Sequence, residues 1–244
     1  MSEMSAMSSL TYAKRRGELE TYFDRTAVEA WTRLTTDAPV SGIRATVRAG
    51  RDAMRATLLG WLPADIRGAR ILDAGCGTGA LAVACALRGA DVVAIDLSPT
   101  LVGLARDRSP RDLKGGSIAF CSGDMLDPGL GRFDHVVAMD SLIHYRTADI
   151  ARVLAQFAER TDASMLFTHA PRTPALTLMH WVGLAFPRAD RAPAIEPVSE
   201  AALARAVTAE PALASWRAAR TQRISTAFYK SQALELVTQG TLAR

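Results

Sequence analysis

The residues whose types and spacing most clearly suggest a ligand-binding role form a glycine-rich turn after a short apolar run. Residues 71–79 read ILDAGCGTG. Gly75, Gly77 and Gly79 allow the chain to turn sharply, and they let a ligand approach the backbone without a Cβ in the way. This pattern alone is weak evidence of the ligand type, because Gly75, Gly77 and Ala80 also fit the looser fingerprint of dinucleotide-binding folds.

Four carboxylates separate the two interpretations. Asp73 lies two residues before the first glycine of the turn, and Asp96, Asp124 and Asp140 end or follow the next three apolar runs. The carboxyl ends of parallel strands share the edge of an open α/β sheet at which ligands bind. A pyrophosphate would be repelled there, whereas a ligand with a cationic sulfonium, an α-amino group and a ribose diol would be attracted. These features favour S-adenosylmethionine over a dinucleotide.

Two further groups of residues could contact a substrate. His144 lies four residues beyond Asp140, where it can hydrogen-bond, accept a proton or ligate a metal, and a structural role is the alternative. Arginines at positions 44, 48, 51 and 55 share one face of an expected helix. That face is either solvated or brings a member such as Arg48 to a carboxylate of the substrate.

The elements that must position these residues alternate between strands and helices. Apolar runs predict five strands that end at Asp73, Asp96, Cys121, Met139 and Thr168. Strands that alternate with helices at this spacing indicate a parallel, doubly wound sheet. Two further strand-like runs, residues 219–225 and 227–237, close the chain and are typical of an antiparallel hairpin.

Two helices are expected before the first strand. Apolar and aromatic residues at helical spacing predict the first over residues 19–34, with Tyr22 and Trp31 on one stripe. Residues 1–11 are small and polar, and we expect them to be frayed. After a proline-containing breaker, an apolar stripe predicts the second helix from about residue 41 to residue 62.

The chain therefore divides into an N-terminal helical arm, residues 1–62, and a ligand-binding domain, residues 63–244. Within the domain, residues 171–197 interrupt the strand–helix pattern after strand five and form an expected insertion. Its centre, residues 176–186, is apolar on nearly every side and contains Trp181. Such a segment is buried, covers an apolar ligand or touches a membrane surface.

Composition excludes several function classes. The 244 residues carry a net charge of +4, and 49% of them are hydrophobic, which is typical of a globular protein with a full core. No block of basic residues indicates a nucleic-acid partner. The three cysteines lack C-x-x-C spacing, which favours reduced thiols over a metal site or a disulfide. Neither a signal peptide nor a transmembrane run is recognisable, so we expect a cytoplasmic protein.

Residues 70–140 resemble the cofactor half of the class I S-adenosylmethionine-dependent methyltransferases. The resemblance implies a mostly parallel seven-stranded sheet with an N-terminal helical arm and an insertion after strand five. It also implies that the glycine-rich turn holds the methionine end of the cofactor, that Asp96 takes the ribose hydroxyls and that Asp124 flanks the adenine. The cofactor-binding residues that we expect are Asp73, Gly75, Cys76, Gly77, Gly79, Asp96, Leu97, Asp124, Met125 and Asp140.

A closer resemblance is to the magnesium-protoporphyrin IX methyltransferases of bacteriochlorophyll synthesis. It is carried by Tyr22-Phe23 with Trp31 and by three motifs: VRAGR at residues 47–51, MDSLIHY at 139–145 and FYKSQALE at 228–235. The resemblance implies methyl transfer to one propionate carboxylate of magnesium protoporphyrin IX. It also implies that the porphyrin brings its own magnesium, so we expect no metal site in the protein. Association with magnesium chelatase and peripheral contact with photosynthetic membranes are further implications.

On this interpretation the catalytic candidates are His144 and Tyr22. The candidate substrate contacts are Tyr145, Trp31, Arg48 and Trp181. A carboxylate is already nucleophilic at neutral pH, so no strong base is needed. His144 could bind the propionate, accept its residual proton or lie axially on the magnesium, and the sequence leaves these roles open. Two other functions also stay open: methylation of another lipophilic acceptor such as a quinone precursor, and non-catalytic porphyrin binding as a chelatase partner.

Overall fold

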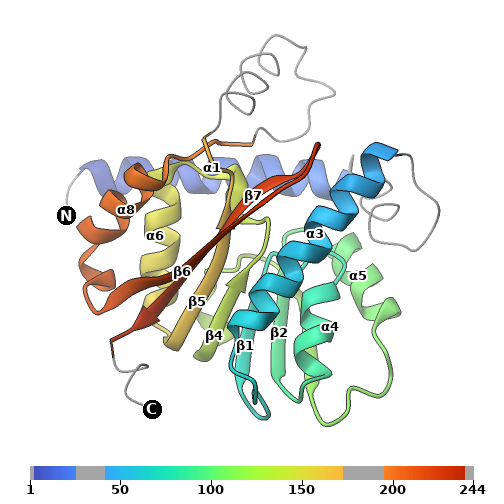
Figure 1. Cartoon of the computed structure of the whole chain (residues 1–244). Helices are drawn as coiled ribbons and strands as arrows, with labels where there is room; N and C mark the ends of the chain where they lie inside the picture. Colours follow the sequence, from blue (N-terminus) through green and yellow to red (C-terminus); the bar gives the residue numbers. More distant parts are fainter. Residues whose placement is uncertain (1–2, 26–41, 173–194, 240–244) are drawn as a thin grey trace.

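A seven-stranded sheet organises the protein in the computed structural model, which describes residues 3–25, 42–172 and 195–239 (Figure 1). Its strands are β1 (Arg70–Ala74), β2 (Asp91–Asp96), β3 (Ser117–Ser122), β4 (Phe133–Ala138), β5 (Thr161–His169), β6 (Trp216–Ser225) and β7 (Lys230–Thr238). They lie in the order β3-β2-β1-β4-β5-β7-β6. Strands β1 to β5 are parallel, and β7 is antiparallel to both β5 and β6. The predicted doubly wound, mostly parallel sheet and its terminal hairpin are confirmed.

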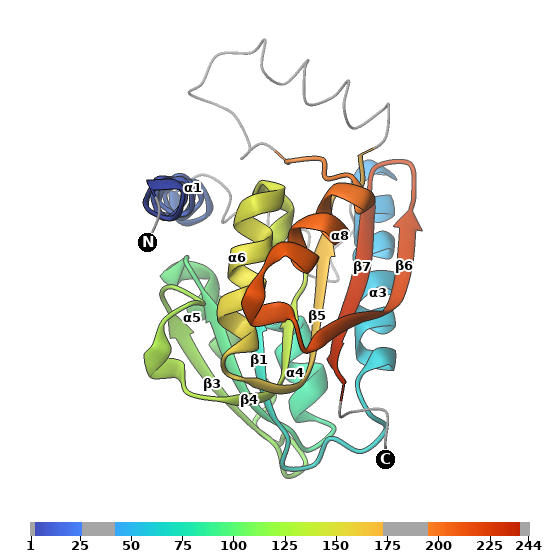
Figure 2. The ribbon, with the colours of Figure 1, turned by 90° about the vertical axis from the view of Figure 1, so that its left-hand side faces the viewer.

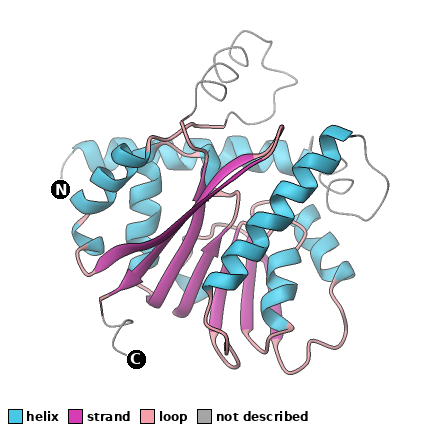
Figure 3. Cartoon of the chain, in the orientation of Figure 1, coloured by secondary structure: helices cyan, strands magenta, loops and turns pink. Residues whose placement is uncertain are grey.

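Helices cover both faces of this sheet (Figures 2 and 3). The helices are α1 (Glu3–Arg25), α3 (Gly42–Trp61), α4 (Ala80–Ala86), α5 (Pro99–Arg108), α6 (Thr147–Ala158) and α8 (Glu200–Ala209). Apolar residues of α6 and α8 belong to one buried cluster, and those of α3 and α4 belong to a second cluster on the other face. Helix α1 crosses the end of the sheet at which the parallel strands finish, in contact with α5 and α6.

Position in the sheet explains the composition of the strands. Strands β1 and β4 lie at the centre and are buried along almost their whole length, which requires apolar side chains on both faces. The edge strand β3 instead has no buried residue.

Helix α5 begins where Ser98 Oγ accepts a hydrogen bond from Leu101 N at 3.2 Å and Pro99 occupies the first turn.

The N-terminal segment corrects one prediction and confirms another. Residues 1–11 were expected to be frayed, but α1 already begins at Glu3, so that expectation is wrong. A tertiary hydrogen bond holds the end of this polar segment: Thr11 Oγ1 donates to Asp149 Oδ1 at 2.9 Å. The second predicted helix is confirmed as α3. Residues 26–34 of the first predicted helix, with Trp31, lie outside the described residues.

Most of the predicted insertion, residues 173–194 with the apolar centre and Trp181, also lies outside the described residues. In the described part of the chain, no helix combines the length and the apolar character needed to cross a membrane.

Candidate active site

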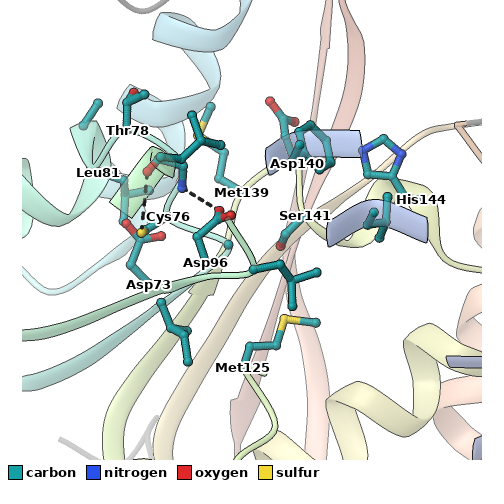
Figure 4. Close-up of a pocket in the computed structure, with 18 of the residues that line it drawn as sticks. Asp73, Cys76, Thr78, Leu81, Asp96, Met125, Met139, Asp140, Ser141 and His144 are labelled. Carbon is teal, nitrogen blue, oxygen red and sulfur yellow. Dashed lines mark hydrogen bonds between the residues drawn. The ribbon is translucent and has the colours of Figure 1, made fainter. Parts of the chain in front are cut away.

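A cavity of about 290 Å³ opens where β1, β2 and β4 end. It lies at the switch point of the sheet, where open α/β folds bind their ligands. Of the residues proposed from the sequence, it is lined by Arg48, Asp73, Gly75, Cys76, Gly77, Asp96, Leu97, Met125, Asp140, His144 and Tyr145. Figure 4 shows Asp73 and Asp96 on one side of this cavity and Asp140 and His144 on the other. Gly79, Asp124 and Tyr22 do not line it.

The glycine-rich turn is fixed over the end of β2. The backbone N–H groups of Gly75 and Cys76 donate to the carbonyl oxygen of Ile95 at 2.8 and 2.9 Å. Gly75 has a φ of 84°, in the left-handed region, and a Cβ there would lie 2.4 Å from Ser141 Cβ. Only glycine allows both this conformation and this approach of the loop after β4.

Asp73 is a buried carboxylate with an unsatisfied oxygen. The residue is 1% exposed, and Oδ2 has no hydrogen-bond partner among the described residues. Burial, together with a smaller contribution from the charge of Asp96, raises the pKa of Asp73 to about 7. A cationic or hydrogen-bonding ligand would relieve this cost, because a buried charge is stabilised by an opposite charge or a donor.

Asp96 connects the turn to the start of α5. Its Oδ2 accepts from Gly77 N at 2.8 Å and its Oδ1 accepts from Ser98 N at 3.0 Å. Burial raises the pKa of Asp96, and the bonds from backbone N–H groups act in the opposite direction. The carboxylate therefore has a fixed orientation at the cavity wall, where each oxygen can accept a further hydrogen bond.

Asp140 is enclosed by side chains from three other elements. Its carboxylate accepts hydrogen bonds from Arg51 Nη1 and from the hydroxyl of Tyr229, both at 3.0 Å. The hydroxyls of Thr168 and Ser231 donate to the same carboxylate at 3.3 Å. Asp140 has a φ of 56°, an unusual conformation for a residue with a side chain. The carboxylate of Asp140 is thus occupied by hydrogen bonds from within the protein.

The arginine face of α3 forms part of the cavity wall. Arg48, Arg51 and Arg55 line the cavity, whereas Arg44 is exposed. Arg55 also pairs with Asp52, at 2.7 Å, on the same helix. Three of the four arginines therefore lie where a ligand in the cavity could reach them, and their contact with a ligand stays a prediction.

His144 borders the cavity from the loop after β4, at the end of a short 3₁₀ helix, Leu142–His144. The ring of Phe23 meets it edge-on, with 5.8 Å between centroids, and its carbonyl oxygen accepts a hydrogen bond from Arg15 Nε at 2.9 Å. The ring of Tyr22 contacts Phe23 at 5.3 Å but does not reach the cavity. Helix α1 therefore presents Phe23, rather than Tyr22, to His144.

Comparison with known proteins identifies the family. Residues 138–238 match the family model described as magnesium-protoporphyrin IX methyltransferase C-terminus, and residues 71–162 match a methyltransferase domain. Over 187 residues the chain is 54% identical to the magnesium-protoporphyrin O-methyltransferase of Rhodobacter capsulatus, an alignment that covers 76% of this chain and 83% of that protein. The chain belongs to the magnesium-protoporphyrin O-methyltransferase family.

The chain is also similar over almost its whole length to magnesium-protoporphyrin methyltransferase from Synechocystis. The Synechocystis magnesium-protoporphyrin O-methyltransferase is 31% identical over 219 residues, 88% of this chain and 93% of that protein. The crystal structure of magnesium protoporphyrin IX methyltransferase from Synechocystis PCC 6803 with bound SAH matches with a TM-score of 0.78. That match has 30% sequence identity and covers 91% of this chain and 99% of that one.

Asp124 has a different environment from the one expected. Its Oδ1 accepts from the hydroxyl of Tyr12 at 2.7 Å, and its Oδ2 pairs with Arg16 Nη1 at 2.5 Å. Both partners belong to α1, so this carboxylate fastens the helix over the cavity, while the neighbouring Met125 forms part of the cavity wall. Tyr12 also stacks on Tyr145, with 5.3 Å between ring centroids.

Sequence reasoning missed the partners of both Asp124 and Asp140. Tyr12 carried no signal, because it lies between residues 1–11, which were expected to be frayed, and the helix predicted from residue 19. Arg51 and Tyr229 lie within the VRAGR and FYKSQALE motifs. Those motifs supported the family resemblance, but nothing in their spacing indicated that both would meet Asp140.

Proposed function

We propose that this protein transfers a methyl group from S-adenosylmethionine to a propionate carboxylate of magnesium protoporphyrin IX and produces the monomethyl ester. The observation that carries the proposal is one cavity in which the carboxylates of the buried Asp73 and the half-buried Asp96 face a histidine and an arginine-bearing helix. One wall suits a cationic methyl donor, and the other suits an anionic acceptor. Membership of the magnesium-protoporphyrin O-methyltransferase family supports the choice of acceptor.

The residues of the carboxylate wall fit S-adenosylmethionine. The unsatisfied Oδ2 of Asp73 can accept a hydrogen bond, and the α-amino group of the cofactor is a suitable donor. Asp96 offers carboxylate oxygens for a ribose diol, and Gly77, which has no described atom within 4 Å of an added Cβ, leaves the backbone open to the cofactor. Leu97 and Met125 supply apolar surface for the adenine. When bound, the cofactor supplies an electrophilic methyl group on a sulfonium.

The protein contributes positioning and exclusion of water more than acid–base chemistry. A propionate is ionised and nucleophilic at neutral pH, so it needs only to be held in line with the methyl group, at roughly 3–3.5 Å. Leu19 and Phe23 of α1 line the cavity on the side of His144 and exclude water there. We assign His144 to contact with the acceptor, and Tyr22 acts beside it through Phe23.

The family resemblance supports three further proposals about organisation. Residues 1–62 act as an arm over the cavity, with Trp31 and Arg48 as acceptor contacts, and Trp181 in the insertion covers the macrocycle. The protein receives its porphyrin from the porphyrin-binding subunit of magnesium chelatase. It is cytoplasmic and associates peripherally with photosynthetic membranes. Co-sedimentation with chelatase subunits and with vesicles tests the last two proposals separately.

The decisive experiment incubates the purified protein with magnesium protoporphyrin IX and methyl-labelled S-adenosylmethionine. Mass spectrometry should show one labelled methyl group on the porphyrin, as an ester. The porphyrin dimethyl ester, which has no free carboxylate, is the matched control acceptor and should stay unlabelled. Porphyrin binding without ester formation would contradict the proposal and favour a carrier, and label on a quinone precursor alone would favour a different acceptor.

A further inference from the structure

We propose that Arg51 is the residue that binds the reacting carboxylate of the acceptor, and that Asp140 and Tyr229 are positioning residues that hold its guanidinium. This inference rests on the proposed function, since it names the group that recognises the propionate. It singles out Arg51 among the three arginines of α3 that line the cavity.

The first argument is the place of Arg51 relative to the glycine-rich turn. Arg51 pairs with Asp140, and the next residue, Ser141, packs directly against Gly75. A Cβ on Gly75 would lie 2.4 Å from that of Ser141, so the loop after β4 touches the turn. The ion pair is therefore anchored next to the segment assigned to the methionine end of the cofactor. The acceptor carboxylate has to arrive at that same place to reach the methyl group.

The second argument is the rigidity of the ion pair. The side chain of Asp140 is 5% exposed, and that of Arg51 is 22% exposed. Tyr229, Thr168 and Ser231 donate to the same carboxylate, and Asp140 N donates to Thr168 Oγ1 at 2.8 Å. Strands β5 and β7 and the hairpin turn before β7 thus orient one carboxylate, which in turn orients Arg51. A side chain that is already ordered loses less entropy when it binds a ligand.

Helix α3 approaches this cluster closely enough to define where Arg51 lies. The residue before it, Gly50, faces the ring of Tyr229, and a Cβ on Gly50 would lie 2.5 Å from Tyr229 Cδ1. Tyr229 therefore supports both residues of the ion pair: its ring packs on the backbone beside Arg51, and its hydroxyl donates to Asp140.

The third argument is charge and geometry. On the α3 side of the cavity, Arg48, Arg51 and Arg55 outnumber Asp52 and Asp140, which leaves an excess of positive charge. A guanidinium has five N–H donors in a planar fork. Its bond to Asp140 is therefore compatible with a bond to an acceptor carboxylate, the ligand whose geometry best matches that fork.

The experiment compares the binding of two porphyrins by fluorescence quenching, without turnover. One is magnesium protoporphyrin IX, and the other is its dimethyl ester, which has the same macrocycle but no carboxylate. Arg51→Met should weaken binding of the acid by at least about tenfold and change binding of the diester less than about twofold. The matched control is Arg44→Met on the exposed part of the same helix face, which should change neither.

Positioning has its own test. Tyr229→Phe keeps the ring against Gly50 and removes the hydroxyl bonds to Asp140, so it should reduce the acid-to-diester affinity ratio by a smaller factor than Arg51→Met. Melting curves and binding of S-adenosylhomocysteine check that each variant is folded. If Arg51→Met does not fold, Arg51→Lys decides the matter, because it keeps the charge and loses the fork, and it should still lower the ratio.

An unchanged acid-to-diester ratio in the folded Arg51 variant would overturn the inference, as would equal weakening of both ligands. The proposed function fails on a different result, namely a wild-type protein that makes no monomethyl ester. The two failures are therefore distinguishable.

Discussion

Replacement of Gly50 by alanine tests how closely α3 must approach the hairpin that carries Tyr229. Gly50 is buried in the middle of α3, and an added Cβ would lie 2.5, 2.8 and 2.8 Å from Tyr229 Cδ1, Cβ and Cγ. These atoms form the base of the side chain and cannot move away without displacing the backbone of the hairpin. Gly60, on the same helix, has no described atom within 4 Å of an added Cβ and is the matched control.

The expected magnitudes have opposite signs at the two positions. Overpacking at Gly50 costs about 1–3 kcal/mol, and the better helix propensity of alanine returns up to about 1 kcal/mol. Gly50→Ala should therefore lower the free energy of unfolding by up to about 2 kcal/mol. Gly60→Ala should raise it by about 0.5–1 kcal/mol. For a chain of this size the two variants should differ in Tm by roughly 1–12 °C.

Thermal melting and urea titration measure this difference, and enzyme kinetics measure its consequence. If the approach of α3 sets the place of Arg51, Gly50→Ala should also raise KM for the porphyrin while leaving affinity for S-adenosylhomocysteine near wild type. The reasoning is refuted if Gly50→Ala is as stable as Gly60→Ala, because the close contact with Tyr229 would then impose no constraint.

The remaining predictions concern the carboxylate wall and His144. Asp96→Asn should weaken S-adenosylhomocysteine binding by at least about tenfold in calorimetry, through loss of charge-assisted hydrogen bonds; the control Asp91→Asn, at the other end of β2, should leave the affinity unchanged. The raised pKa of Asp73, about 7 against an ordinary 3.8, means that the folded protein without cofactor keeps a proton that the unfolded chain releases. The free energy of unfolding should therefore fall as pH rises from about 4 to 7, by at most about 4 kcal/mol. Asp73→Asn should flatten that fall in urea titrations, and an equally steep fall would contradict the assignment. His144→Ala should lower kcat/KM strongly with cofactor affinity unchanged, and wild-type turnover would remove His144 from the mechanism. Tyr22→Phe should cost less than His144→Ala, since Tyr22 reaches the site only through Phe23.

Local patterns in the sequence were sufficient to predict the strands and the glycine-rich turn that border the site. Apolar runs predicted the strands, and the last residue of β2 is Asp96, as expected. The left-handed φ of Gly75 matches the turn inferred from the motif. Such features depend on neighbours along the chain. The apolar pattern of a strand is visible in its own residues, and a glycine removes backbone strain at its own position.

The partners of the charged groups were not predictable in this way. Asp140 ends a readable pattern, yet Arg51 and Tyr229 each lie 89 residues away from it along the chain. They meet only because β7 pairs with β5 and α3 crosses the sheet at that point. A one-dimensional pattern contains no information about that crossing.

The N-terminal helix shows the same division. Its first residues have no apolar stripe strong enough to predict order, and the helix persists because Tyr12 and Arg16 bind Asp124, more than a hundred residues later. The sequence by itself determined the strands, the glycine turn and the ring of carboxylates, since these follow from short-range periodicity and backbone freedom. Only the tertiary structure decided which carboxylates remain directed at the cavity and which are bound by α1 and α3, because that depends on long-range packing.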